Sequence, residues 1–107
     1  MKIQNFNEFI NENLNDYPLP ANETIGYDKG STSKVIYKLS NGSYQRLYVT
    51  DWNDNEIEIP ERNLKDFVYD FSKMNIKDFL HEYGAEYAWT CTWNKTANRW
   101  EGEERYC

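Results

Sequence analysis

The sequence has few of the side chains that bind metals or act as nucleophiles. Its 107 residues include one histidine, His81, and two cysteines, Cys91 and Cys107, with no Cys-x-x-Cys pair. A zinc site would therefore lack most of its usual ligands, and we expect neither a metal nor a cofactor. The five glycines are scattered, so the chain also lacks the glycine-rich loop that cradles phosphates.

Long hydrophobic runs are also missing. No apolar stretch approaches the roughly 18 residues that a membrane helix needs. Residues 1–5 (MKIQN) have no apolar core of the kind that a secretion signal carries. We therefore expect a cytoplasmic protein, in a bacterial host, and no contact with a membrane. Both cysteines are then expected to be free thiols. Continued extension of the last strand would also hold them about 16 Å apart, beyond disulfide reach.

Aromatic residues, in contrast, are abundant. They make up 17% of the chain, with four tryptophans, nine tyrosines and five phenylalanines, although only 39% of residues are hydrophobic. Disordered chains contain few aromatic residues, so this composition predicts a folded protein. Each ring can bury roughly 150–250 Å², which predicts a core built from a few large side chains. A chain of 107 residues fits one domain, spanning residues 1–107.

Basic residues are outnumbered, and the charges are unevenly distributed. The net charge is -6, from 12 basic and 18 acidic residues. Because phosphate neutralisation supplies much of the affinity for nucleic acids, this sign favours a basic protein partner over nucleic acid. Residues 51–61 hold five carboxylates and no basic residue, whereas residues 34–50 hold Lys34, Lys38 and Arg46 and no acidic one.

The first half of the chain predicts a helix, a loop and a hairpin. Apolar residues at helical spacing, after a possible Asn5 cap, predict a helix over about 6–15. Prolines and turn residues then predict a surface loop at about 18–32. Asn41-Gly42 predicts a two-residue turn in a hairpin over 33–51. In that register Arg46 faces Tyr37, on the opposite side of the ribbon from Lys34 and Lys38.

The second half predicts one strand, two helices and a second hairpin. Alternation predicts a short strand over 56–59, which ends at Pro60. Helical spacing predicts helices over about 61–73 and 76–83, the second with Asn75 as its cap, Gly84 at its end and Ile76 among its inward residues. The last segment predicts strands over about 86–93 and 99–106, with Trp93 facing Trp100. We therefore expect an α+β fold in the order α-β-β-β-α-α-β-β, with three helices on one face of an antiparallel sheet of about five strands.

Catalytic and calcium-binding motifs fit this sequence poorly. The segment that begins at Asp51 starts like a calcium loop, but it has Glu56 where glycine is needed and Arg62 where a bidentate glutamate is needed. A thiolate mechanism would require Cys91 beside His81, whereas Cys91 fits a buried position in an aromatic strand. The carboxylate pairs Glu56/Glu58 and Glu101/Glu103 fit solvated strand faces better than a glycosidase cleft. We expect no enzyme and no catalytic residues.

Two surfaces remain as candidate binding sites. Tyrosine and tryptophan are enriched in protein-interface hot spots, and four tryptophans exceed what a small core usually holds. We expect Trp52 and Trp100 to be the exposed ones. The expected partner-binding residues combine them with nearby carboxylates: Asp51, Trp52, Asp54, Glu56, Glu58, Trp100, Glu101, Glu103 and Glu104. The residues for a possible nucleic-acid contact are Lys34, Lys38, Tyr44 and Arg46, since cations beside aromatic rings hold single strands.

These observations favour a small acidic protein-binding module that acts by covering a partner. The richness in Asn, Lys, Ile and Tyr suggests an A+T-rich coding sequence, as in many phages and mobile elements. The concrete expectation is an inhibitor of a nucleic-acid-handling bacterial defence protein, similar in action to an anti-CRISPR protein, whose basic groove it blocks. The alternatives are an immunity or antitoxin protein that neutralises a basic toxin, and an RNA-contacting protein that uses the 34–50 hairpin.

Overall fold

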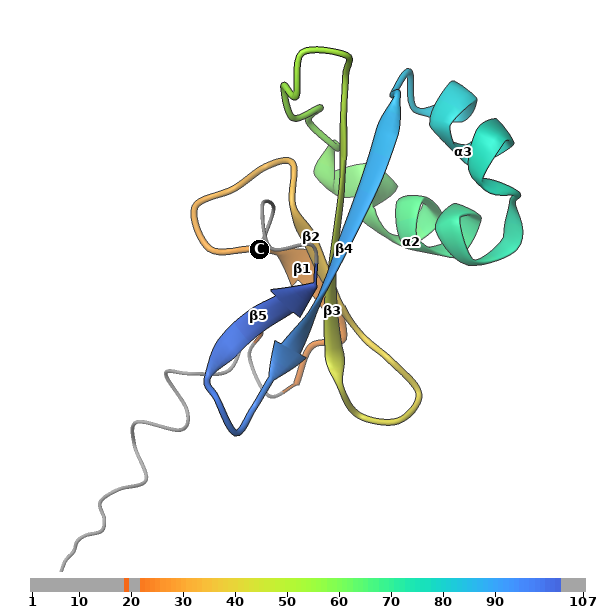
Figure 1. The fold of residues 1–107 in the computed structure, drawn as a ribbon. Helices are drawn as coiled ribbons and strands as arrows, with labels where there is room; N and C mark the ends of the chain where they lie inside the picture. Colours follow the sequence, from red (N-terminus) through yellow and green to blue (C-terminus); the bar gives the residue numbers. More distant parts are fainter. Residues whose placement is uncertain (1–18, 20–21, 103–107) are drawn as a thin grey trace, which may run out of the picture.

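The computed structural model describes residue 19 and residues 22–102. Five strands form one antiparallel sheet whose spatial order follows the chain: β1 (Ile25–Tyr27), β2 (Val35–Lys38), β3 (Tyr44–Thr50), β4 (Tyr87–Asn94) and β5 (Arg99–Gly102). The connection between β3 and β4 holds a 3₁₀ turn, η1 (Glu61–Asn63), and the helices α2 (Leu64–Lys73) and α3 (Ile76–Glu82). Both helices lie on the same side of the long β3–β4 pair (Figure 1). The predicted α+β class with a five-stranded antiparallel sheet is confirmed.

The two described helices match their predicted ranges. The side-chain oxygen of Asn75 accepts a hydrogen bond from the Asp78 N–H at 2.9 Å, which caps α3 as expected. Gly84 has a φ of 63°, the left-handed conformation that ends a helix and that glycine adopts without strain. Ile76 is 53% exposed, so its predicted inward position is wrong. The predicted helix over 6–15 lies outside the described residues.

The sheet has five strands, but one of them is not where the sequence predicts it. Ile25–Tyr27, inside the predicted loop at 18–32, forms the edge strand β1 and pairs with β2. The predicted strand over 56–59 is wrong, because this segment makes only one isolated bridge, from Glu56 to Thr50. Its alternation instead reflects burial: Ile59 is 2% exposed and packs into the core.

The predicted register of the β2–β3 hairpin is wrong by one residue. Val35 pairs with Leu47, and Ile36 pairs with Arg46. The cause is a three-residue loop, in which Leu39 N–H bonds to the Ser43 carbonyl at 2.7 Å and Gly42 has a φ of 91°. Because strand side chains alternate, this shift moves Arg46 to the same sheet face as Lys34 and Lys38.

The β4–β5 hairpin has the predicted register. Trp93 pairs with Trp100, and their rings meet edge to face with centroids 5.3 Å apart. Cys91 pairs with Gly102, where the described part of β5 ends. Cys91 is 1% exposed and disulfide-bonded, so the expectation of a free thiol there is wrong. That expectation assumed that the last strand stays extended up to Cys107, which lies outside the described residues.

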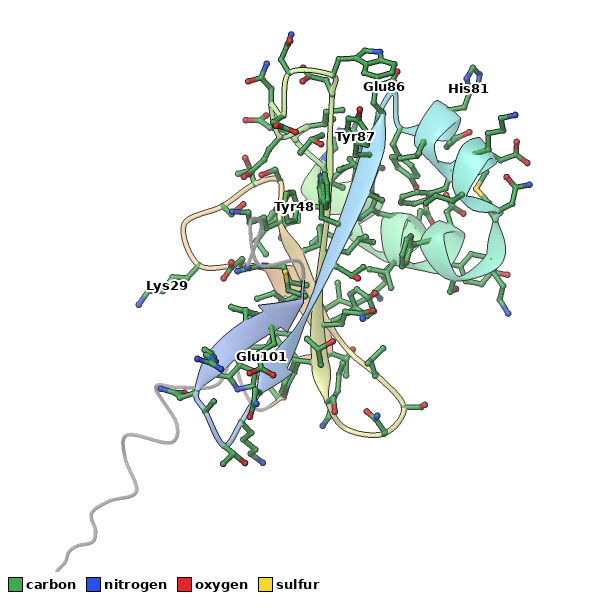
Figure 2. The ribbon with its side chains drawn as sticks, in the orientation of Figure 1. Lys29, Tyr48, His81, Glu86, Tyr87 and Glu101 are labelled. Carbon is green, nitrogen blue, oxygen red and sulfur yellow. The ribbon has the colours of Figure 1, made fainter. Side chains whose placement is uncertain are left out.

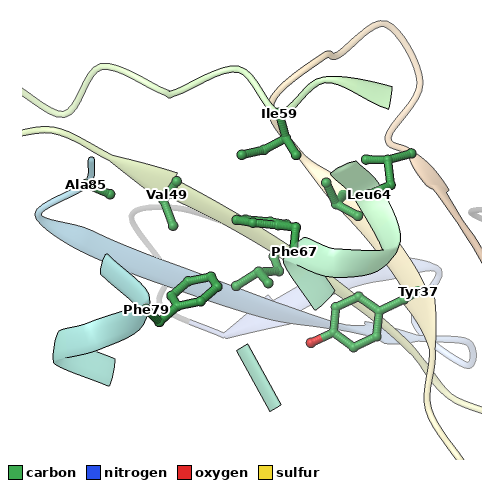
Figure 3. Close-up of a cluster of buried hydrophobic side chains, with 9 residues drawn as sticks. Tyr37, Val49, Ile59, Leu64, Phe67, Phe79 and Ala85 are labelled. Carbon is green, nitrogen blue, oxygen red and sulfur yellow. The ribbon is translucent and has the colours of Figure 1, made fainter. Parts of the chain in front are cut away.

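The core lies between the sheet and the two helices. It is formed by buried residues of β2, β3, the 59–64 segment, α2 and α3: Val35, Tyr37, Leu47, Val49, Ile59, Leu64, Phe67, Phe79 and Ala85. Figure 3 shows Phe67 and Phe79 between the helices and the strands. Both rings are 0% exposed, with centroids 5.4 Å apart. The expected core of a few large aromatic side chains is therefore only partly correct, because Tyr37, Phe67 and Phe79 pack there among mostly aliphatic residues.

Candidate functional site

The sheet face that points away from the helices is unusually aromatic. We call it the aromatic face, and it consists of alternate residues of β2 to β5: Ile36, Lys38, Tyr44, Arg46, Tyr48, Thr50, Tyr87, Trp89, Cys91, Trp93 and Trp100. Its centre is buried, since Ile36 is 0% and Tyr48 3% exposed. Its two ends differ from the centre because they carry exposed or half-buried aromatic rings.

Arg46 lies at the buried centre of the aromatic face and is 7% exposed. Its Nη1 donates to Asp28 Oδ2 at 2.9 Å, and its guanidinium lies over the Trp100 ring at 4.7 Å from the centroid. Its Nε has no hydrogen-bond partner among the described residues. Arg46 is thus part of the packing of the fold, and its charge is neutralised by Asp28. Trp100 is half-buried over this charge, so its predicted exposure is wrong.

Glu56 and Lys34, from the two predicted sites, bind each other. Lys34 Nζ lies 3.2 Å from Glu56 Oε2, and Ser33 donates its hydroxyl proton to Glu56 Oε1. The Ser33 hydrogen bond, together with Lys34 and the more distant Arg46, holds the pKa of the Glu56 carboxyl below its usual value. These two charges therefore hold residues 31–34, which precede β2, against residues 51–58, which follow β3. We call the latter segment the 51–58 connection.

This contact predicts an acid-sensitive contribution to stability. Because the pKa of Glu56 is lower in the folded state, its ionised carboxylate stabilises the fold at pH values above the unfolded-state pKa of about 4.3. This contribution is lost as the pH falls through the folded-state pKa. We expect Glu56→Gln to flatten the dependence of unfolding free energy on pH below about 5. Urea unfolding between pH 7 and 3 measures this slope, with the exposed Glu58→Gln as the matched control. Equal slopes for wild type and Glu56→Gln would contradict the assignment.

One end of the aromatic face carries Trp52, the most exposed aromatic side chain among the described residues. Its exposed fraction is 71%, which confirms the expectation for this residue. Its ring meets Tyr87 edge to face with centroids 5.8 Å apart, and Tyr87 is itself 38% exposed and lies 5.9 Å from Trp89. Three aromatic rings therefore form a continuous row from the 51–58 connection onto β4.

A tight turn holds Trp52 in this position. The Asp51 carboxylate accepts the backbone N–H groups of Asn53 at 2.8 Å and Asn55 at 3.0 Å, and these bonds lower the pKa of Asp51. Asp54 adopts a φ of 64°, a left-handed conformation that aspartate tolerates in turns. The carboxylate of Asp51 thus orders the turn that presents the indole ring.

The two segments that carry this row contain acidic residues and no lysine or arginine of their own. Glu86 N–H bonds to the Thr50 carbonyl at 2.9 Å, which brings the start of β4 beside the 51–58 connection. Figure 2 shows Glu86 and Tyr87 together at this end of the molecule. Residues 47–61 and 78–94 contain no lysine or arginine. We call this surface the acidic end and define it by its members: Asp51, Trp52, Asp54, Glu86 and Tyr87.

The remaining predicted partner-binding residues lie away from the acidic end. Glu101 lies toward the other end of β4 (Figure 2) and is bonded to Asn94 and Arg99 at 3.0 and 3.1 Å. Glu58 is exposed in the 51–58 connection, and Glu103 and Glu104 lie outside the described residues. Of the nine predicted residues, the structure therefore brings together Asp51, Trp52 and Asp54.

Sequence reasoning missed Glu86 and Tyr87. Tyr87 alternates with the other aromatic residues of β4, which indicated its face but not its place at an open end of the sheet. Its nearness to Trp52 depends on the pairing of Thr50 with Tyr87 across the whole helical connection. A signal was nevertheless present, since both segments lack basic residues.

The Cys91–His81 pair, which the sequence analysis considered and set aside, does not form, because Cys91 is buried in a disulfide and His81 is exposed on α3. Within residues 19 and 22–102, no three His, Cys, Asp or Glu side chains cluster as a metal site would require. None of the described helices has the length and apolar character needed to cross a membrane.

Comparisons with known proteins give no relative from which a function could be transferred. No protein-family model matches the sequence, no curated protein matches it, and no solved structure matches its fold. The functional argument therefore rests on the geometry of the aromatic face and its two ends.

Proposed function

We propose that this chain is a protein-binding module that uses its acidic end to cover a basic surface of a partner protein. The observation that carries the proposal is the 71% exposure of Trp52, in edge contact with Tyr87 and held by an ordered turn. A ring that is left so exposed to water contributes little to the stability of the fold itself. Tryptophan and tyrosine are the residues that most often dominate interface energies.

The surrounding charge supports a cationic partner. Asp51, Asp54 and Glu86 belong to the same two segments as the exposed rings, and these segments contain no lysine or arginine. An arginine or lysine side chain of a partner would find both an aromatic face and a carboxylate there, which favours cation–π contact and charge pairing together. A nucleic-acid groove of a nuclease has this chemistry, so an inhibitor that blocks such a groove is the form of the proposal to test first.

Truncation of the exposed indole tests the proposal. We expect Trp52→Ala to weaken partner binding by at least about tenfold, because hot-spot tryptophans contribute more than ~1.4 kcal/mol. Stability should change little, since the side chain is largely exposed. Tyr69→Ala is the matched control, because Tyr69 is also an exposed aromatic residue, 61% exposed, but lies on α2.

The measurement begins with wild type, Trp52→Ala and Tyr69→Ala as baits in nuclease-treated bacterial lysate. A protein retained by wild type and Tyr69→Ala, but lost from Trp52→Ala, is then titrated by calorimetry at several salt concentrations. Glu86→Lys should weaken its binding and reduce the salt dependence. Glu56 is unsuitable for this reversal because it holds Lys34 within the fold. Equal binding by Trp52→Ala and wild type would overturn the proposal.

A further inference from the structure

A hollow of about 350 Å³ lies at the other end of the aromatic face, between the loops of the two hairpins. Figure 1 shows both loops at the same end of the sheet. The residues that line the hollow are Asn41, Gly42, Ser43, Tyr44, Trp93 and Lys95. No residue of the acidic end is among them, so a ligand bound here is separate from the proposed function.

Two aromatic rings from neighbouring strands border this hollow. The β3–β4 ladder ends at the Gln45–Thr92 pair, and Tyr44 and Trp93 come next on the two strands. The Trp93 ring meets Trp100 at 5.3 Å between centroids, but no ring in the described part of the chain contacts Tyr44. Both side chains are half-buried. The hollow therefore offers two separate ring surfaces to an apolar group of a ligand.

The polar groups in these walls are mainly hydrogen-bond donors. The indole N–H of Trp93 and the hydroxyl groups of Tyr44 and Ser43 form no hydrogen bond in the described part of the chain. Asn41 uses its side-chain carbonyl to accept the Ser43 N–H at 2.9 Å, which leaves its NH₂ group. Residues 29–50 and 87–100, which include both loops, contain no aspartate or glutamate. A ligand would thus find several donors here and no carboxylate.

We propose that this hollow binds a proline-rich peptide in the polyproline II conformation, with a proline ring packed against Tyr44 and Trp93. The backbone carbonyls of such a peptide form no internal hydrogen bonds, and its prolines bring no N–H donor. These carbonyl oxygens complement the walls in charge, because the walls present N–H and O–H groups and no carboxylate. Aromatic-lined grooves are the usual sites at which proteins recognise proline-rich segments.

The size and the polarity of the walls both favour this ligand. The volume lies at the small end of ligand sites and suits about one three-residue turn of a polyproline II helix. A saccharide would also pack on aromatic rings, but its hydroxyl groups bring donors that need acceptors. Because neither loop carries a carboxylate, those hydroxyl donors would be poorly paired.

Amide NMR of the ¹⁵N-labelled full chain tests the proposal with three probes: a peptide of about ten prolines, a glycine-serine peptide of equal length and maltotriose. We expect the Trp93 indole N–H and the Gly42 N–H signals to shift with the proline peptide and to saturate below about 1 mM. The glycine-serine peptide and maltotriose should leave both signals in place. Lack of shifts with the proline peptide, or equal shifts with another probe, overturns the proposal.

Removal of the two donors with both rings kept provides the second readout. Tyr44→Phe/Trp93→Phe should weaken binding of the proline peptide by about fivefold or more, because each change deletes one hydrogen bond to a backbone carbonyl. Tyr69→Phe is the matched control, since it removes a hydroxyl group from an exposed ring on α2. Trp52→Ala should leave binding of the proline peptide unchanged. Equal affinities of the double variant and Tyr69→Phe would overturn the proposal.

Discussion

Replacement of Phe79 by alanine is expected to lower the free energy of unfolding by about 3–5 kcal/mol. Its ring is 0% exposed and lies 5.4 Å from Phe67, 5.2 Å from Phe71 and 5.0 Å from Tyr83. These contacts join α3 to α2 within the core cluster that also contains strand residues, so the substitution leaves a cavity in the core. Domains of this size have a total stability of about 5–15 kcal/mol, so the loss would remove a large part of that stability.

Urea unfolding followed by circular dichroism measures this effect. Ile76→Ala, three residues earlier on the same helix, is the control, because Ile76 is 53% exposed. We expect that control to lose less than about 1 kcal/mol. Similar losses for the two variants would show that Phe79 does not anchor α3 in the core.

The second large effect is expected at the buried ion pair. Asp28→Ala should cost about 3 kcal/mol or more, because it leaves the Arg46 guanidinium buried without a counter-charge. The Arg46 side chain is 9% exposed against 24% for Asp28, and Arg46 Nε already lacks a partner. Water therefore has little access to the Arg46 guanidinium when the carboxylate is removed.

A double-mutant cycle distinguishes this charge effect from lost packing. Arg46→Met removes the buried charge and keeps an extended side chain against Trp100, so Asp28→Ala should cost far less in that background. Chemical unfolding of the four proteins gives the coupling energy. If Asp28→Ala costs the same in both backgrounds, the two side chains act independently and the ion-pair account is wrong.

The helices could be predicted from the sequence because their signals are local. Leu64 and Phe67 recur at helical spacing, and Asn75 and Gly84 mark the ends of α3 through their own backbone and side-chain chemistry. Strand β1 could not be predicted this way, since three residues around Gly26 are too few to show alternation. It forms because Ile25 and Tyr27 pack on the helix side, opposite Leu19, which lies close against Gly26.

The hairpin register shows how a small local difference changes a predicted site. Asn41-Gly42 suits a two-residue turn, but Gly42 serves here as the left-handed third residue of a longer loop. That single residue places Tyr44, Arg46 and Lys38 on one face, where the sequence analysis had separated Arg46 from the lysines. Yet the shared face does not make a basic stripe, because Asp28 reaches Arg46 from the 28–34 loop.

The candidate site could be predicted only in the part whose signal is local. Trp52 could be recognised as exposed because it lies in a polar, turn-rich segment that offers no apolar face. The neighbours that complete the acidic end, Glu86 and Tyr87, come from a distant segment and depend on long-range pairing. Neither segment alone indicates that the two lie close together, because their proximity depends on the fold.

The placement of both helices between β3 and β4 has a consequence for how the chain folds. Every other strand pair is a hairpin closed by a short loop, whereas β3 can meet β4 only after residues 51–86 have been folded back. Closing a long segment costs chain entropy, but α2 and α3 shorten it as they form. The helical pair thus lowers the effective contact order of the central strand pairing. The same pairing brings Trp52 to Tyr87, so the acidic end can be assembled only once β3 and β4 have paired.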